Sequence, residues 1–110
     1  MARSKKAVSC PAETTLKIIG GRWKLMILRQ LAAGASRFGE LHRDLNGISE
    51  KILTQHLREL EEDGVISRKI YPEVPAKVEY ALTPSGKTLK PIIEAMHEWG
   101  ITHSSRDKNF

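Results

Sequence analysis

The sequence predicts an α+β fold, mostly α, of the winged helix-turn-helix class. Three observations support this prediction. Up to residue 63, apolar residues recur at helical spacing, and the helical segments end at glycines. After Gly64 the apolar residues alternate with polar ones, as they do in strands. A last helical segment follows Thr83-Pro84. We therefore expect a three-helix core and a two-stranded β-hairpin, the wing, with further helices at both ends.

Length and composition fit one compact domain of 110 residues, of which 40% are hydrophobic. No apolar run is long enough to span a membrane, and the start, MARSKKAVSC, lacks the apolar stretch of a signal peptide. The one cysteine, Cys10, cannot form an internal disulfide. We expect a cytoplasmic protein. The net charge of +5 suggests a polyanionic partner.

Turn and cap signals set the expected boundaries. Residues 1–9 form a basic arm, and Pro11 then opens a short helix that ends at Gly20-Gly21. A second helix follows and ends at Gly34. The helix-turn-helix comprises residues 38–45, the turn at Asn46-Gly47 and residues 49–63.

The helix at 49–63 has two different faces. Ser49 is its expected N-cap, and Leu53, Leu57 and Leu60 form its buried stripe. The opposite side carries the side-chain types that bind base edges and phosphates: Lys51, Thr54, Gln55 and Arg58. Because Glu61, Glu62 and Asp63 would repel phosphates, only the N-terminal part of this helix should enter a major groove. The alternative is an ordinary solvated helix face.

The two predicted strands, 65–71 and 77–83, flank a loop with two prolines. Arg68, Lys69 and Lys77 make this hairpin basic, so we expect it to touch the DNA backbone or the minor groove. Glu73 near the tip weakens this interpretation, and a proline-stiffened loop without a DNA contact is the alternative.

The C-terminal helix begins at Pro84, although Pro91 predicts a kink or a later helix start. Its apolar stripe is wider than the core of a small monomer needs, and a two-fold dimer would cover it. The stripe consists of Leu89, Ile92, Ile93, Met96 and Trp99. Alternatively, the stripe only completes the core of the monomer.

The chain resembles the HxlR-type winged-helix transcriptional regulators, relatives of the MarR group. The resemblance covers roughly residues 10–100 and rests on Cys10-Pro11, GGRWKLMIL, RFGEL, GISEKILTQHLRELEEDGVISR, VPAKVEYALTPSG and EWG. It implies a homodimer on a two-fold-related operator, with the first and last helices, about 10–20 and 84–100, at the interface and residues 101–110 as a tail. Leu16 and Ile19 would then join the interface from the first helix.

In some members of that family an N-terminal cysteine senses oxidants or electrophiles, and Cys10 is the matching residue. Lys5 and Lys6 would favour its thiolate. The alternative is a buried, unreactive cysteine.

The sequence argues against an enzyme, a metal site or a cofactor. The four histidines are scattered, and no phosphate-binding loop or nucleophile elbow is present. We therefore predict a sequence-specific, homodimeric regulator that binds double-stranded DNA, with Cys10 as a candidate redox sensor and no assigned effector. The alternative is a winged helix that binds an acidic protein and has no specific DNA target. A small enzyme with Cys10 as its nucleophile is a further rival, disfavoured because no base is placed beside it.

Overall fold

The computed structural model describes residues 10–104, so the basic arm predicted for residues 1–9 lies outside the described residues. The element order is that of a winged helix-turn-helix, which confirms the predicted fold class. The elements are α1 (Pro11–Ile19), α2 (Arg22–Ala33), β1 (Ser36–Arg37), α3 (Phe38–Asp44), α4 (Glu50–Glu62), β2 (Ile66–Tyr71), β3 (Lys77–Leu82), α5 (Pro84–Lys87) and α6 (Lys90–Ser104).

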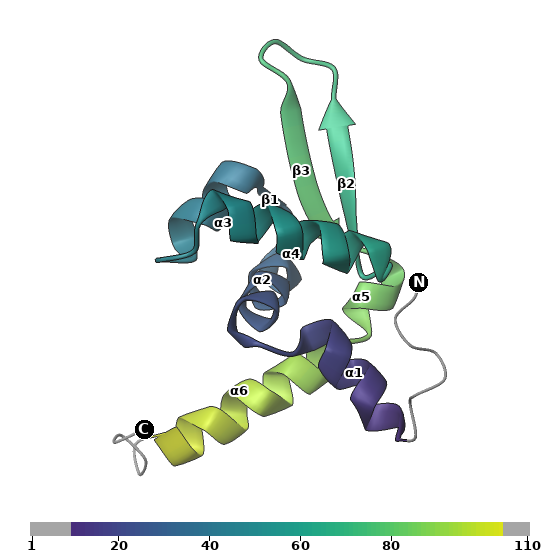
Figure 1. Cartoon of the computed structure of the whole chain (residues 1–110), viewed down its shortest axis with the longest axis vertical. Coiled ribbons are helices and arrows are strands. Elements are labelled where there is room, and N and C mark those ends of the chain that lie inside the picture. The colour runs from purple at the N-terminus through teal and green to yellow at the C-terminus, as the bar shows by residue number, and fades with distance from the viewer. Residues whose placement is uncertain (1–9, 105–110) are drawn as a thin grey trace.

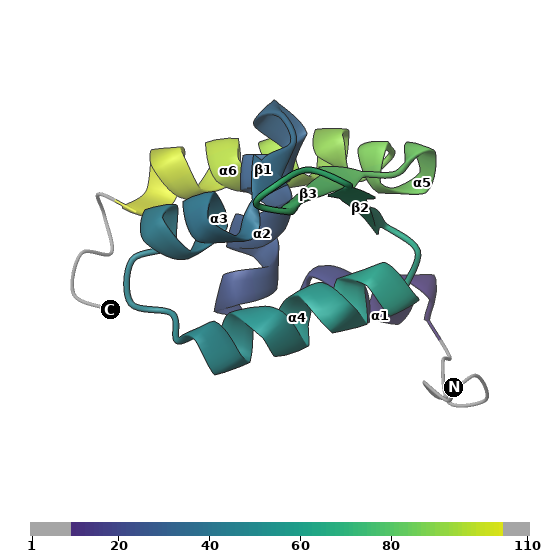
Figure 2. The ribbon, with the colours of Figure 1, turned by 90° about the horizontal axis from the view of Figure 1, so that it is seen from above.

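The hairpin of β2 and β3 projects from the body at the end opposite to α1 and α6 (Figure 1). Seen from above, α4 lies along one side of the body and α6 along the other (Figure 2). This arrangement leaves the outer face of α4 and the hairpin accessible from one end of the molecule, while the helices at the chain ends gather at the other end.

Apolar side chains from most elements meet in one core beneath α4. Leu53, Leu57 and Leu60 are buried there, as the predicted stripe requires. Each such side chain contributes about 1.5–3 kcal/mol when it is fully removed from water. Their burial fixes the rotation of α4 about its axis, so the polar side of the helix must face solvent.

Local signals set both ends of α4. At the N-terminus, the Ser49 hydroxyl oxygen accepts a hydrogen bond from the backbone N–H of Ile52 at 3.1 Å. At the C-terminus, Gly64 has a φ of 80°, and the next N–H, that of Val65, returns to the carbonyl of Leu60 at 3.2 Å. A side chain at position 64 would be strained in this left-handed conformation, so glycine ends the helix and turns the chain into β2.

The described residues contain a three-stranded antiparallel sheet in the order β1-β3-β2, not the two-stranded hairpin expected from the sequence. In β1, Ser36 pairs with Tyr80 of β3. A strand of two residues is too short to show an alternating pattern, which is why the sequence did not reveal it. In the hairpin, Lys69 pairs with Glu79 and Tyr71 with Lys77.

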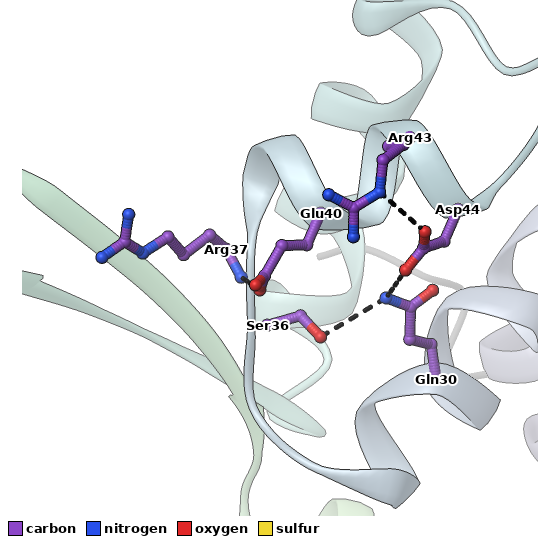
Figure 3. Close-up of polar contacts among 6 residues, drawn as sticks. All are labelled: Gln30, Ser36, Arg37, Glu40, Arg43 and Asp44. Carbon is purple, nitrogen blue, oxygen red and sulfur yellow. Dashed lines mark hydrogen bonds and ion pairs between the residues drawn. The ribbon is translucent and has the colours of Figure 1, made fainter.

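A polar cluster joins α2 to the first helix of the helix-turn-helix (Figure 3). The Gln30 side-chain amide donates to Asp44 Oδ2 at 3.1 Å and to Ser36 Oγ at 3.4 Å. The backbone N–H of Arg37 donates to Glu40 Oε1 at 2.8 Å and closes the N-terminus of α3. The Arg37 side chain points away from this cluster (Figure 3), so its charge stays outside the joint.

The C-terminal segment forms two helices instead of one. Thr83 caps the short α5 through its hydroxyl, and α6 starts at Lys90 with Pro91 as its second residue. The delayed helix start predicted from Pro91 is therefore what occurs. α6 continues to Ser104, beyond the expected boundary at residue 100. No helix among residues 10–104 is long and apolar enough to cross a membrane.

Candidate nucleic-acid interface

One face of α4 presents the four predicted contact residues together. Lys51, Thr54, Gln55 and Arg58 are all exposed, on the side opposite to the buried leucines. With Glu50 they line a shallow depression of about 470 Å³. Hydrogen-bond donors and acceptors of this kind, gathered on the N-terminal part of a helix, match the edges of bases in a major groove.

Ser49 has a structural task at the start of this face. Its hydroxyl oxygen is occupied by the capping bond from Ile52 N–H, but its own O–H remains available to donate. Ser49 is exposed, so a phosphate oxygen could accept a hydrogen bond from this O–H without disturbing the cap.

The wing brings two ammonium groups onto one aromatic ring. Lys69 Nζ lies 4.8 Å and Lys77 Nζ 4.6 Å from the ring centroid of Tyr71, both within cation–π range. The Tyr71 hydroxyl donates to Glu79 Oε1 at 3.1 Å, which fixes the ring from its other end. Sequence reasoning missed Tyr71, although its position two residues after Lys69 on a strand placed both side chains on one face.

The acidic end of α4 touches the base of the wing. Arg68, the third predicted wing residue, places its Nε 3.9 Å from Glu61 Oε1. The two side chains are 45% and 40% exposed and their charges are screened by water, so this pair adds little stability. The Arg68 guanidinium does offset the charge of Glu61, near the point where the predicted groove contact ends. Glu62 is exposed to solvent.

A second set of contacts behind α4 was not predicted from the sequence. Lys24 of α2 is only 8% exposed, and its Nζ lies 2.6 Å from Glu59 Oε1. Glu59 Oε2 in turn accepts from Gln55 Nε2 at 3.4 Å. The hydrogen bond from Lys24 holds the pKa of the Glu59 carboxyl below its ordinary value, against the opposing effect of desolvation.

Cys10 is exposed and occupies the N-cap position of α1. This exposure contradicts the alternative of a buried cysteine, and the reactivity of the thiol stays a prediction. Lys5 and Lys6, which we expect to favour the thiolate, lie outside the described residues.

The predicted dimer residues divide into two groups. Ile19, Leu89 and Ile93 are buried in the core of the monomer. By contrast, the side chains of Leu16, Ile92, Met96 and Trp99 are 60%, 42%, 43% and 65% exposed. Only the second group is free to meet a second copy of the chain.

Within residues 10–104, no group of three or more histidine, cysteine, aspartate or glutamate side chains is arranged to hold a metal ion.

The family description "HxlR-like helix-turn-helix" matches residues 18–108 of the chain. The chain belongs to this family. It is a transcriptional regulator of the helix-turn-helix type and not an enzyme.

Relatives of known sequence in the HxlR-like family carry names of the same kind. The chain is 50% identical over 97 residues to the "Uncharacterized HTH-type transcriptional regulator YdeP" of Bacillus subtilis (strain 168). The aligned region covers 88% of this chain and 76% of that protein. The chain is 45% identical over 100 residues to an HTH-type transcriptional regulator of Methanothermobacter thermautotrophicus, with 91% and 76% covered.

Solved structures similar to this chain include a protein described as a redox regulator. The chain is similar to the redox regulator HypR in its reduced form, with a TM-score of 0.87 at 42% identity, covering 92% of this chain and 100% of that one. It is also similar to diamide-treated YodB from B. subtilis, with a TM-score of 0.73 at 34% identity, covering 86% and 95%.

Proposed function

We propose that the protein acts as a homodimer that binds double-stranded DNA at a specific, two-fold-related operator. The observation that carries this proposal is the placement of Lys51, Thr54, Gln55 and Arg58 on the exposed face of α4, at the end of the molecule from which the basic wing projects. Helix-turn-helix proteins insert the N-terminal part of their second helix into the major groove, and α4 is that helix.

In the proposed complex, the exposed side chains of α4 contact base edges, and the wing contacts the backbone or the minor groove beside them. The two ammonium groups beside Tyr71 suit phosphate, because both are positive charges on the same hairpin. Glu62, exposed at the end of α4, would lie where the groove contact stops.

The dimer in this proposal uses α1 and α6. Five large apolar residues are exposed on these helices: Leu16, Ile92, Met96, Trp99 and Ile101. The first four are residues of the predicted interface, and exposed apolar patches often mark interaction sites. A two-fold dimer covers the same patch on both copies and sets the distance between the two α4 helices. That distance would fix the spacing of the operator half-sites.

Regulation in this proposal acts through Cys10. The thiol is exposed, and the similar structures include that of HypR, which is described as a redox regulator. Because the chain has a single cysteine, any disulfide of Cys10 must be formed with another molecule, either a second copy of the chain or a small thiol.

The test is a salt titration on a duplex selected from a randomised pool. Binding through phosphates releases counterions, so the affinity should fall by a thousandfold or more, to order of magnitude, between roughly 50 and 200 mM salt if six or more phosphates are contacted. Negligible duplex binding at low salt would contradict the proposal and favour the alternative, a winged helix that binds an acidic protein.

A further inference from the structure

A chain of polar contacts runs from the interior of the domain to the DNA-facing side of α4. Its first member, Lys24, belongs to α2 and is almost fully buried. Its ammonium nitrogen is 2.6 Å from Glu59 Oε1, and the other oxygen of that carboxylate accepts from Gln55 Nε2 at 3.4 Å. Gln55 is exposed on the face proposed to contact bases. One ion pair and one hydrogen bond therefore connect the buried Lys24 to Gln55, the side chain proposed to contact a base.

Glu59 is held more firmly than an ordinary surface carboxylate. Its side chain is only 34% exposed, and that of its partner Lys24 only 9%. A charge-assisted hydrogen bond as short as this one is among the stronger polar contacts in proteins. The lowered pKa of Glu59 means that it stays ionised at neutral pH.

An ionised carboxylate can only accept hydrogen bonds, which decides the orientation of Gln55. The amide nitrogen, and not the amide oxygen, must face Glu59. One N–H is used in that contact. The second N–H and the amide oxygen remain, and these are the donor and the acceptor that a glutamine uses against N7 and the N6 amino group of adenine. A free glutamine could rotate its amide and present the two groups the other way round.

We propose that Glu59, anchored by Lys24, is a positioning residue that fixes the carboxamide of Gln55 for the recognition of an adenine in the operator. This inference rests on the proposed function, because it assigns a base preference to the same face of α4. Glu59 itself does not touch the DNA. It restricts the Gln55 side chain in the free protein, so that less conformational entropy is lost when the complex forms.

The experiment compares the base preferences of variants on duplexes selected from a randomised pool. Wild type should favour adenine at one position of each half-site by about tenfold. Gln55→Ala should remove that preference. Glu59→Gln should reduce it to less than about threefold, because a neutral amide can both donate and accept and no longer dictates the orientation of Gln55. Lys24→Met, which keeps the apolar stem, should act in the same direction.

Glu62→Gln is the matched control. It removes the same charge from the same helix, at an exposed site in α4. Both glutamine variants lower the repulsion of DNA and should bind all duplexes somewhat more tightly. Only Glu59→Gln should lose the adenine preference, so a general charge effect is separated from positioning.

A measurement on the free wild-type protein tests the inference even if the variants do not fold. The side-chain amide signals of Gln55 in an NMR spectrum should shift as Glu59 titrates in acid, whereas those of the exposed Asn46 should not follow that titration. Gln55 signals that are indifferent to Glu59 would overturn the inference. So would an unchanged adenine preference in Glu59→Gln. A wild type that selects no sequence would instead refute the proposed function.

Discussion

The hydroxyl of Thr83 donates to the carbonyl oxygen of Gly64 at 2.7 Å and accepts from the backbone N–H of Gly86 at 3.0 Å. Gly64 ends α4, and Thr83 precedes α5, so one side chain joins α4 to the C-terminal segment. The backbone N–H of Thr83 also donates to the carbonyl of Val65 at 3.0 Å, where the wing begins. Thr83, in the segment that leads to α6, therefore holds the end of α4 and the start of the wing together by hydrogen bonds.

Thr83→Val should destabilise the protein by about 1–2 kcal/mol. The substitution keeps the shape of the side chain but removes the helix cap and the bond to Gly64. Urea unfolding followed by circular dichroism measures the change. Thr102→Val is the control, because Thr102 only returns its hydroxyl to Glu98 on an exposed helix. Equal effects of the two substitutions would refute the joining role of Thr83.

Gly86→Ala adds only one methyl group, but it should destabilise the fold. A Cβ at position 86 would lie 2.0 Å from the carbonyl oxygen of Val65, which is backbone and cannot move aside. We expect a loss of about 1–3 kcal/mol in the free energy of unfolding, as for other overpacked sites. Gly100→Ala is the counterpart, since nothing lies within 4 Å of a Cβ there and alanine favours a helix. It should leave stability unchanged or raise it by up to about 1 kcal/mol; similar losses for both variants would contradict this account.

The sequence predicted those boundaries that depend on neighbouring residues. Ser49 and Thr83 both form their expected caps, and Gly64 ends α4 in the left-handed conformation. Each signal acts over three or four residues of one segment, so the sequence alone contains it. The fold class follows from these signals and their order, and the family follows from the resemblance of the quoted sequence motifs; both are confirmed.

Features that depend on packing between distant segments could not be predicted. The apolar spacing of the last helix does not tell which of its residues meet α2, so Ile93 and Met96 looked alike, although Ile93 is buried and Met96 is exposed. The contact of Lys24 with Glu59 joins two helices separated by the whole of α3. For the same reason the polar face of α4 was predictable from periodicity, but its anchor was not. The assignment of that face to DNA stays a prediction.

Arg58→Ala should weaken binding to the selected operator by about 1–3 kcal/mol if Arg58 contacts a base. The guanidinium is exposed on α4 and can form two hydrogen bonds to one guanine. Fluorescence anisotropy at fixed salt gives the affinity. Arg29→Ala removes the same charge from α2, on the side where Arg29 contacts His97 of α6, and should change affinity little. If both variants lose the same affinity, net charge and not docking explains the effect.

Met96→Glu should raise the dissociation constant of the dimer by about 30-fold or more, which is typical of a disrupted interface hot spot. Met96 is exposed in the monomer, so its replacement should not unfold the chain. Ile93→Glu would not serve this purpose, because Ile93 is buried in the core. Light scattering over a dilution series measures the dimer. Ile101→Glu makes the same change about 140° around α6 and should leave the dimer intact. A Met96→Glu variant that stays dimeric at nanomolar concentration would rule out this interface.

The ion pair between Lys24 and Glu59 should make stability depend on pH in acid. Because Lys24 lowers the pKa of Glu59 in the folded protein, the carboxylate stabilises the fold fully above its unfolded pKa, about 4.3 for glutamate, and loses that contribution as the pH falls through the folded value. Wild type should therefore exceed Glu59→Gln in the free energy of unfolding above about pH 5.5, and this difference should shrink below pH 4. Urea unfolding at several pH values measures it. For Glu62→Gln, which is exposed on the same helix, the difference should stay small throughout. A difference for Glu59→Gln that does not change with pH would mean that Lys24 does not hold the ionised carboxylate.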